Sequence, residues 1–246
     1  MKRVLVVHGW MHSAARYERL RRDLEQSGDC RVELYEFPGF GHTSAGCRKD
    51  VLNHYRLEMK KYLEQQEFDL IVAHSMGAGV VLGALSEAVR KDGQKLVLLS
   101  PVYGGVDCLK PLILLSPLSG IGLRLLQRPS AVCGLVLRLI SLLTIDRWKD
   151  VDEQIIRDVR RADPDVAVRT LFELAFDRWR IPEVRPGLRV LLVLGEKDRV
   201  VRKGKMAMLK KDLGGCRVKI LKGIGHTAVV EDYERLLRIV KGELWC

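Results

Sequence analysis

Short runs of consecutive apolar residues alternate with longer helical patterns along this chain of 246 residues, and this alternation restricts the fold more than any other feature. Because the runs are apolar at neighbouring positions, each predicted strand is buried on both faces, as in a parallel sheet covered by helices. The predicted strands are 3–7, 31–37, 69–73, 95–99, 189–194 and 217–221. The predicted helices are 13–26, 49–66, 76–91, 201–213 and 229–241. The predicted fold class is therefore a doubly wound α/β fold with a mostly parallel sheet of about six strands.

One long segment interrupts the alternation, because no strand pattern occurs between Leu99 and Leu188. Its apolar residues follow helical patterns, and prolines divide it at Pro101, Pro111, Pro117, Pro129, Pro164, Pro182 and Pro186. Since proline ends or kinks a helix, we expect several short helices inserted between the fourth and fifth strands. The predicted organisation is an α/β core formed by residues 1–104 and 187–246 and a helical cap formed by residues 105–186.

The composition excludes several other classes of protein. Hydrophobic residues make up 47% of the chain and only 8 residues are proline, which excludes disorder, collagen and coiled coil. The longest apolar stretch, 131–145, contains Arg138 and is shorter than the ~20 residues of a membrane-spanning helix. The charged start precedes only four apolar residues, too few for a signal peptide. The six cysteines lie far apart without a C-x-x-C pair, which favours reduced thiols, a cytoplasmic location and no metal site.

The formal net charge of +11 raises the question of a nucleic-acid partner. Residues 186–246 carry 14 basic and 7 acidic side chains and hold most of the excess. The basic segment 197–222 contains no aromatic residue on which a base could stack. We therefore expect a solvated basic face and no nucleic-acid partner.

Residues that can do chemistry directly follow the predicted strands. His8-Gly9-Trp10 follows the first strand, Ser75 the third, Asp198 the fifth and His226 the sixth. Because the carboxyl ends of parallel strands meet at one edge of a sheet, these residues are expected at one site. Serine, histidine and aspartate are the residue types of a nucleophile, its base and the acid that orients the base.

The residues around Ser75 are small on both sides. The segment Ala73-His74-Ser75-Met76-Gly77 runs from strand to helix, and a sharp turn of this kind has no room for bulky side chains two residues from the nucleophile. It resembles the nucleophile elbow of the α/β hydrolase family, with Ala73 in place of the first glycine. Four further segments resemble other motifs of this family. They are the His-Gly loop at 8–10, the acidic-x-Pro-Gly-x-Gly turn at 36–41, the strand and acid at 190–198 and the histidine loop at 223–227.

The resemblance implies a serine hydrolase that needs no cofactor and no metal. It assigns roles to three side chains and two backbone amides: Ser75 as nucleophile, His226 as base, Asp198 as orienting acid, and the N–H groups of Trp10 and Met76 as the oxyanion hole. Glu196 is the competing acid, since it precedes Asp198 by only two residues.

The first half of the predicted cap has an unusual composition. Residues 111–145 include 20 apolar residues and three arginines but no acidic or aromatic side chain. One interpretation is an apolar acyl pocket under a mobile lid, with Leu135, Leu139 and Trp10 contacting the substrate; the other is a thoroughly buried helix. The pocket interpretation predicts a small-molecule ester or thioester substrate and leaves transient contact with a lipid surface open.

We therefore expect a serine esterase of lipase-like type that cleaves carboxylic esters with an apolar, medium-chain acyl group. Three alternatives stay open: a thioesterase or acyltransferase acting on carrier-bound acyl chains, a carbon–carbon bond hydrolase with the same triad, and a non-catalytic ligand-binding protein on the same fold. The sequence does not define the leaving group or the oligomeric state.

Overall fold

A parallel β-sheet forms the centre of the molecule. The computed structural model describes residues 1–47, 49–87, 93–110, 153–178, 180 and 188–245. Within these residues the sheet has six strands, all paired in parallel in the order β2-β1-β3-β4-β5-β6. The strands are β1 (Lys2–Val7), β2 (Cys30–Tyr35), β3 (Leu70–His74), β4 (Lys95–Leu99), β5 (Arg189–Gly195) and β6 (Arg217–Leu221). The predicted fold class is confirmed.

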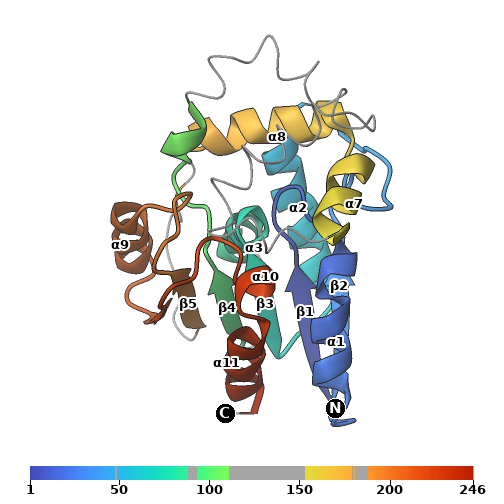
Figure 1. The fold of residues 1–246 in the computed structure, drawn as a ribbon, viewed down its shortest axis with the longest axis vertical. Helices are drawn as coiled ribbons and strands as arrows, with labels where there is room; N and C mark the ends of the chain where they lie inside the picture. The colour runs from blue at the N-terminus through green and yellow to red at the C-terminus, as the bar shows by residue number, and fades with distance from the viewer. Residues whose placement is uncertain (48, 88–92, 111–152, 179, 181–187, 246) are drawn as a thin grey trace.

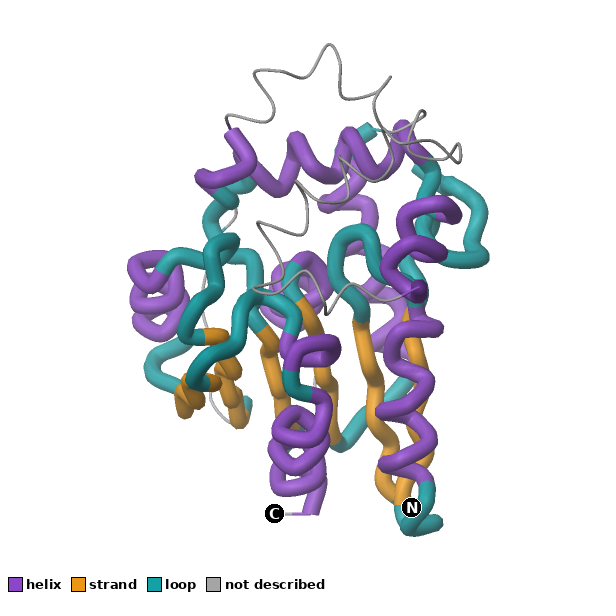
Figure 2. The backbone as a smooth tube through the Cα atoms, in the orientation of Figure 1, coloured by secondary structure: helices purple, strands orange, loops and turns teal. Residues whose placement is uncertain are grey.

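Helices cover both faces of this sheet, as Figures 1 and 2 show. One face is covered by α1 (Glu18–Glu25), α10 (Ala228–Glu231) and α11 (Tyr233–Trp245). The other face is covered by α2 (Val51–Gln65), α3 (Met76–Glu87) and α9 (Lys203–Asp212). Both chain ends lie at the amino edge of the strands, opposite the edge where the strands finish (Figure 1).

Successive side chains of the central strands belong to different hydrophobic clusters. In β1, Val4 and Val6 pack with α1 and α11, whereas Leu5 and Val7 pack with α2 and α3. All four side chains are buried, as are all five residues of β3. Side chains alternate between the faces of a strand, so a strand with helices on both faces needs apolar residues at every position. This requirement explains the continuous apolar runs of the sequence.

The last strand differs from this pattern. Four of the five residues of β6 are exposed, including Val218 and Ile220. β6 is an edge strand with only β5 as a neighbour, so the expectation that every strand is covered on both faces is wrong here. Its charged residues, Arg217 and Lys219, are typical of an edge strand that avoids pairing with other chains.

Three predicted elements begin, end or break at other places than expected. The predicted strand 31–37 ends at Tyr35, because the Phe37 N–H donates to the His8 ring, 3.0 Å away, instead of to a neighbouring strand. The predicted helix 229–241 is two helices, α10 and α11, because the Asp232 carboxylate accepts the Arg235 N–H, 3.1 Å away, and caps the start of α11. The predicted helix 13–26 begins as a short 3-10 helix, η1 (Ala14–Tyr17), before α1.

The segment between β4 and β5 supplies helices above the carboxyl edge of the sheet. These are η2 (Asp107–Leu109), α7 (Glu153–Arg161) and α8 (Pro164–Phe176), and α8 lies across the end of the molecule in Figure 1. Asp163 accepts the N–H groups of Asp165 and Val166, so Pro164 begins a helix here instead of ending one.

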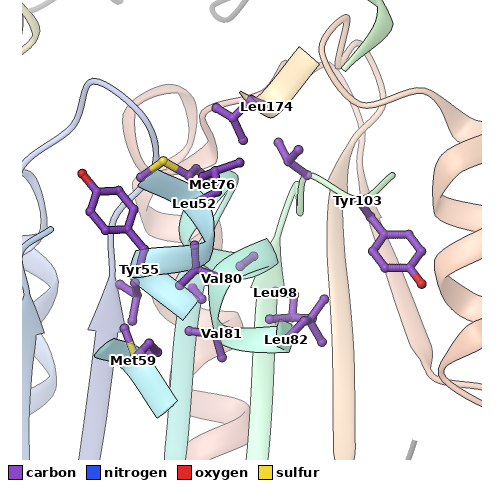
Figure 3. Packing of buried hydrophobic residues seen from close by; sticks show 14 of the residues in the cluster. Leu52, Tyr55, Met59, Met76, Val80, Val81, Leu82, Leu98, Tyr103 and Leu174 are labelled. Atoms are coloured by element: carbon purple, nitrogen blue, oxygen red, sulfur yellow. The ribbon is translucent and has the colours of Figure 1, made fainter. Parts of the chain in front are cut away.

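Part of the predicted cap, residues 111–152, 179 and 181–186, lies outside the described residues, and Leu135 and Leu139 lie there too. The cap boundaries at 105 and 186 stay predictions. Figure 3 shows Leu174 of α8 directed toward Met76, the first residue of α3, and both side chains belong to one buried cluster. Cap and core therefore share a hydrophobic core close to Ser75.

Candidate active site

Ser75 lies on the turn between β3 and α3 with a left-handed backbone, φ +51°. Few residues other than glycine adopt this conformation, which costs about 1–3 kcal/mol and persists only where the surroundings enforce it. The Ser75 N–H donates to the Leu99 carbonyl oxygen over 2.9 Å, and its own carbonyl accepts the Val102 N–H over 3.1 Å. The strand β4 and the turn after it thus hold Ser75 at the carboxyl edge of the sheet.

The small residues near Ser75 allow the backbones to come close together. A Cβ atom on Gly77 would overlap the carbonyl oxygen of His8, and one on Gly79 would lie 2.6 Å from that of Val102. A Cβ on Gly9 would lie 2.8 Å from Nδ1 of His74 and 3.1 Å from Cβ of Ser75. The loop after β1 therefore contacts the serine turn directly, and glycine is needed on both sides of that contact.

The structure brings together the three side chains that the sequence predicts from strands β3, β5 and β6. His226 Nε2 lies 2.8 Å from Ser75 Oγ, and His226 Nδ1 lies 2.9 Å from Asp198 Oδ2. The side chains of His226 and Asp198 are about 5% and 4% exposed, so the chain of hydrogen bonds is shielded from water. This geometry allows a proton to pass from the hydroxyl to a base that a carboxylate orients.

Asp198 is held as a carboxylate. Its Oδ1 accepts the N–H groups of Val200 and Val201, each over 2.9 Å. Burial alone would raise the pKa of Asp198, but His226, the Val201 N–H and the Ser100 hydroxyl outweigh it and lower the pKa to about 2. The competing acid, Glu196, is exposed and accepts the Gly223 N–H over 3.0 Å. The structure therefore brings Asp198, and not Glu196, to His226.

Two buried side chains, Glu231 and His74, hold the loop around His226. The sequence did not predict this role for them. Glu231 accepts the N–H of Gly225 over 2.8 Å and that of Thr227 over 3.0 Å, one on each side of His226. Nε2 of His74 lies 3.1 Å from the carbonyl oxygen of His226 and donates to it. Burial lowers the pKa of His74 to about 3, which keeps the ring neutral. Glu231 in particular could not be predicted, because no motif of the site includes it.

Trp10 and Met76, the predicted oxyanion donors, lie next to the serine turn. Met76 follows Ser75 and begins α3, where the first N–H groups of a helix have no partner within the helix. Trp10 follows Gly9, which contacts Ser75. The half-buried Trp10 side chain donates its indole N–H to the carbonyl oxygen of Ala167 in α8, 3.1 Å away.

The turn at 36–41 connects two loops of the site. The Glu36 carboxylate accepts the Ala14 N–H over 2.9 Å and the His42 N–H over 3.0 Å. Gly39 and Gly41 have left-handed backbones, φ +86° and +59°, and a Cβ on Gly41 would overlap the Glu36 carboxylate. The glycines of this motif therefore leave room for a carboxylate that joins the loop after β1 to the loop after β2.

Metal ligands and membrane-crossing helices are two further features to consider. In the described part of the chain, no three histidine, cysteine, aspartate or glutamate side chains gather closely enough to hold a metal ion. Of the helices that the structure describes, none has the length and apolar character needed to cross a bilayer.

Comparison with known proteins places the chain among known folds. Residues 4–239 match the profile of the family described as the alpha/beta hydrolase family. No curated protein matches the sequence significantly. Solved structures do match: an esterase from Exiguobacterium antarcticum has a TM-score of 0.81 at 15% identity, with 100% of this chain and 92% of that chain covered.

Two further solved structures show the same likeness. An esterase from Rhodococcus sp. ECU1013 has a TM-score of 0.73 at 16% identity, with 99% of this chain and 90% of that chain covered. A hydrolase from Oleispira antarctica has a TM-score of 0.74 at 16% identity, with 100% and 91% covered. At these identities the likeness shows a shared fold.

Proposed function

Because the chain belongs to the α/β hydrolase family, we propose that it is a serine hydrolase that cleaves carboxylic esters through Ser75, His226 and Asp198. One observation carries the proposal: the hydrogen-bonded series from Ser75 Oγ to His226 and from His226 to Asp198, at the carboxyl edge of the sheet. A serine that only served packing would not need a left-handed backbone and a buried histidine at its hydroxyl.

The proposed reaction has two halves. His226 Nε2 accepts the hydroxyl proton of Ser75 as Oγ attacks the ester carbonyl carbon, and Asp198 stabilises the cation that forms on His226. The backbone N–H groups of Trp10 and Met76 bind the oxyanion, for about 3 kcal/mol each. His226 then donates its proton to the leaving alcohol. Water attacks the acyl-enzyme in the same way, which releases the acid and restores Ser75.

The substrate we propose is an ester with an apolar acyl group of medium length. The solved structures described as esterases share this fold, which supports ester chemistry. The apolar stretch 111–145, with Leu135 and Leu139, supports an apolar acyl group, as does the tryptophan at position 10 beside the serine turn.

A serine-directed fluorophosphonate tests the mechanism. We expect the reagent to label Ser75 in the native protein, as mapped by mass spectrometry of the peptides. Ser75→Ala should abolish both labelling and ester turnover while the circular dichroism spectrum stays unchanged, because only the nucleophilic oxygen is lost. Absence of label at Ser75 in the folded native protein would refute a catalytic triad.

A series of p-nitrophenyl esters from acetyl to decanoyl tests the acyl preference. Each methylene buried in an apolar pocket contributes up to ~0.8 kcal/mol, so kcat/KM should rise a few-fold per carbon until the pocket is full. Matched thioesters identify the leaving group: a thioester hydrolysed faster than its ester would change the proposal to a thioesterase. Equal kcat/KM for acetyl and octanoyl esters would contradict an acyl pocket.

A further inference from the structure

Asp158 of α7 makes a buried ionic contact with the loop after β1, residues 9–17, although α7 belongs to the segment inserted between β4 and β5. Its carboxylate is 1% exposed and the Arg16 guanidinium is 3% exposed. Asp158 Oδ2 accepts from Nε and one terminal nitrogen of Arg16, each over 3.1 Å. Asp158 Oδ1 accepts from Ser13 Oγ over 2.5 Å and from Gln154 over 2.6 Å.

Stability alone is a weak explanation for this contact. The loss of hydration when two ions are buried largely cancels their attraction, and well-packed apolar residues of similar size often stabilise a protein equally well. What the ions add is geometry, because two guanidinium N–H groups meet one carboxylate oxygen while Ser13 and Gln154 donate to the other, and directed bonds of this kind fix both distance and orientation. The position of Ser13 and Arg16 relative to α7 is therefore fixed more tightly than apolar packing would fix it.

The same loop has a second contact with the inserted segment and a direct contact with the serine turn. The Trp10 indole donates to Ala167 in α8. Met11, the next residue, has a left-handed backbone, φ +57°, which needs support from its surroundings. Gly9 contacts Ser75. The loop thus contacts the serine turn at Gly9, and α7 holds its other end at Ser13 and Arg16. The backbone N–H of Trp10 lies between these two fixed points.

We propose that Asp158 is a positioning residue for the oxyanion hole. By holding Ser13 and Arg16, it keeps residues 9–13 in the conformation that directs the Trp10 N–H at the developing oxyanion. The inserted helices therefore take part in catalysis as well as covering the site. This inference rests on the proposed serine hydrolase mechanism and names a residue outside its triad.

Asp158→Asn tests this role, because it removes the charge at almost constant shape. Removal of a whole oxyanion donor costs about 10²–10³ in kcat, so a displaced donor should cost 10-fold or more. We expect that fall in kcat with KM changed less than threefold. The affinity for an alkyl trifluoromethyl ketone, whose adduct with Ser75 carries an oxyanion, should fall by the same factor as kcat/KM. Glu153→Gln, an exposed change on the same helix, is the control and should alter neither.

A second variant separates positioning from stability. Arg16→Met combined with Asp158→Met replaces the ion pair by apolar side chains and should restore a melting temperature near that of the native protein. We expect kcat to stay at least 10-fold low in this stable variant. Native kcat in either Asp158→Asn or the double variant would overturn the inference. Fluorophosphonate labelling of Ser75 in the native protein is measured separately. Absence of this label would refute the proposed function, whereas native kcat in the variants would refute only this inference.

Discussion

The two parts of the site that meet at Ser75 are held in different ways. The serine turn is held by backbone packing: Ser75 bonds to β4, and Gly77 leaves room for the carbonyl of His8. The loop after β1, residues 9–17, is held mainly by side-chain hydrogen bonds to other segments. The Asp158 carboxylate accepts from Ser13 and Arg16, the Glu36 carboxylate accepts the Ala14 N–H, and the Trp10 indole donates to the Ala167 carbonyl oxygen. The proposed nucleophile is therefore fixed by the core itself, whereas its neighbouring loop depends on the inserted helices.

This difference predicts how each part responds to substitution. Backbone contacts leave no alternative packing, so changes that add atoms between the backbones at the serine turn should affect both fold and activity. Side-chain hydrogen bonds contribute about 1 kcal/mol each, so changes in the loop after β1 should alter geometry and rate while the fold remains.

Asp198→Asn should have the largest effect on activity, because Asp198 belongs to the proposed triad and lies in the part that the core holds. An amide at this position orients the His226 ring in the wrong tautomer, and we expect kcat to fall by up to ~10⁴. Glu196→Gln is the matched control and should change kcat less than threefold, since Glu196 contacts the Gly223 N–H and not His226. Steady-state kinetics on one ester measures both, and a loss below tenfold for Asp198→Asn would place the orienting role elsewhere.

Gly77→Ala should damage both the fold and the activity. The added methyl group overlaps the His8 carbonyl oxygen, and the backbone atoms on both sides cannot move away easily. We expect the free energy of unfolding to fall by about 3 kcal/mol and kcat to fall about 100-fold. Gly242→Ala in α11, where a Cβ meets nothing within 4 Å, is the control and should be neutral or stabilising by up to about 1 kcal/mol. Urea unfolding of both variants decides, and equal stability would contradict a closely packed turn.

The same contrast explains how far the sequence predicts the structure. Patterns within about ten residues predict the strands, the small residues around Ser75 and the order of Ser75, Asp198 and His226. The structure places them as those patterns predict. Asp158 could not be predicted, because its contact with Ser13 joins residues 145 apart and nothing local distinguishes it from Glu153, the exposed acid of the same helix. The exposed β6 could have been predicted from its alternating charges.

Acid should destabilise the protein through its buried histidines. Burial lowers the pKa of His8, of His12 and, to about 3, of His74. The unfolded chain binds these protons near pH 6.5 and the folded chain does not, so stability is complete above that pH and falls as the pH decreases toward the folded value. For His74 alone we expect a loss of about 2 kcal/mol between pH 7 and pH 5.

His74→Asn checks this sign, because asparagine does not titrate. The difference in unfolding free energy between pH 7 and pH 5 should be smaller in the variant by about 2 kcal/mol. His42→Asn, at an exposed histidine, is the control for replacing an imidazole by an amide. If His74→Asn loses as much stability on acidification as the native protein, His74 binds its proton in the folded chain as readily as in the unfolded chain, and burial does not keep its ring neutral.

Trp10→Phe should have the smallest effect and tests the loop after β1 directly. The change keeps an aromatic ring of similar shape but removes the indole N–H that donates to Ala167. A hydrogen bond of this kind is worth about 1 kcal/mol, so we expect kcat to fall about fivefold with the melting temperature almost unchanged. Trp245→Phe, on the exposed end of α11, is the control for tryptophan removal and should leave kcat unchanged. A Trp10→Phe variant that loses stability but keeps native kcat would contradict this expectation. It would mean that the bond between Trp10 and α8 serves folding, and that the loop after β1 keeps its conformation without it.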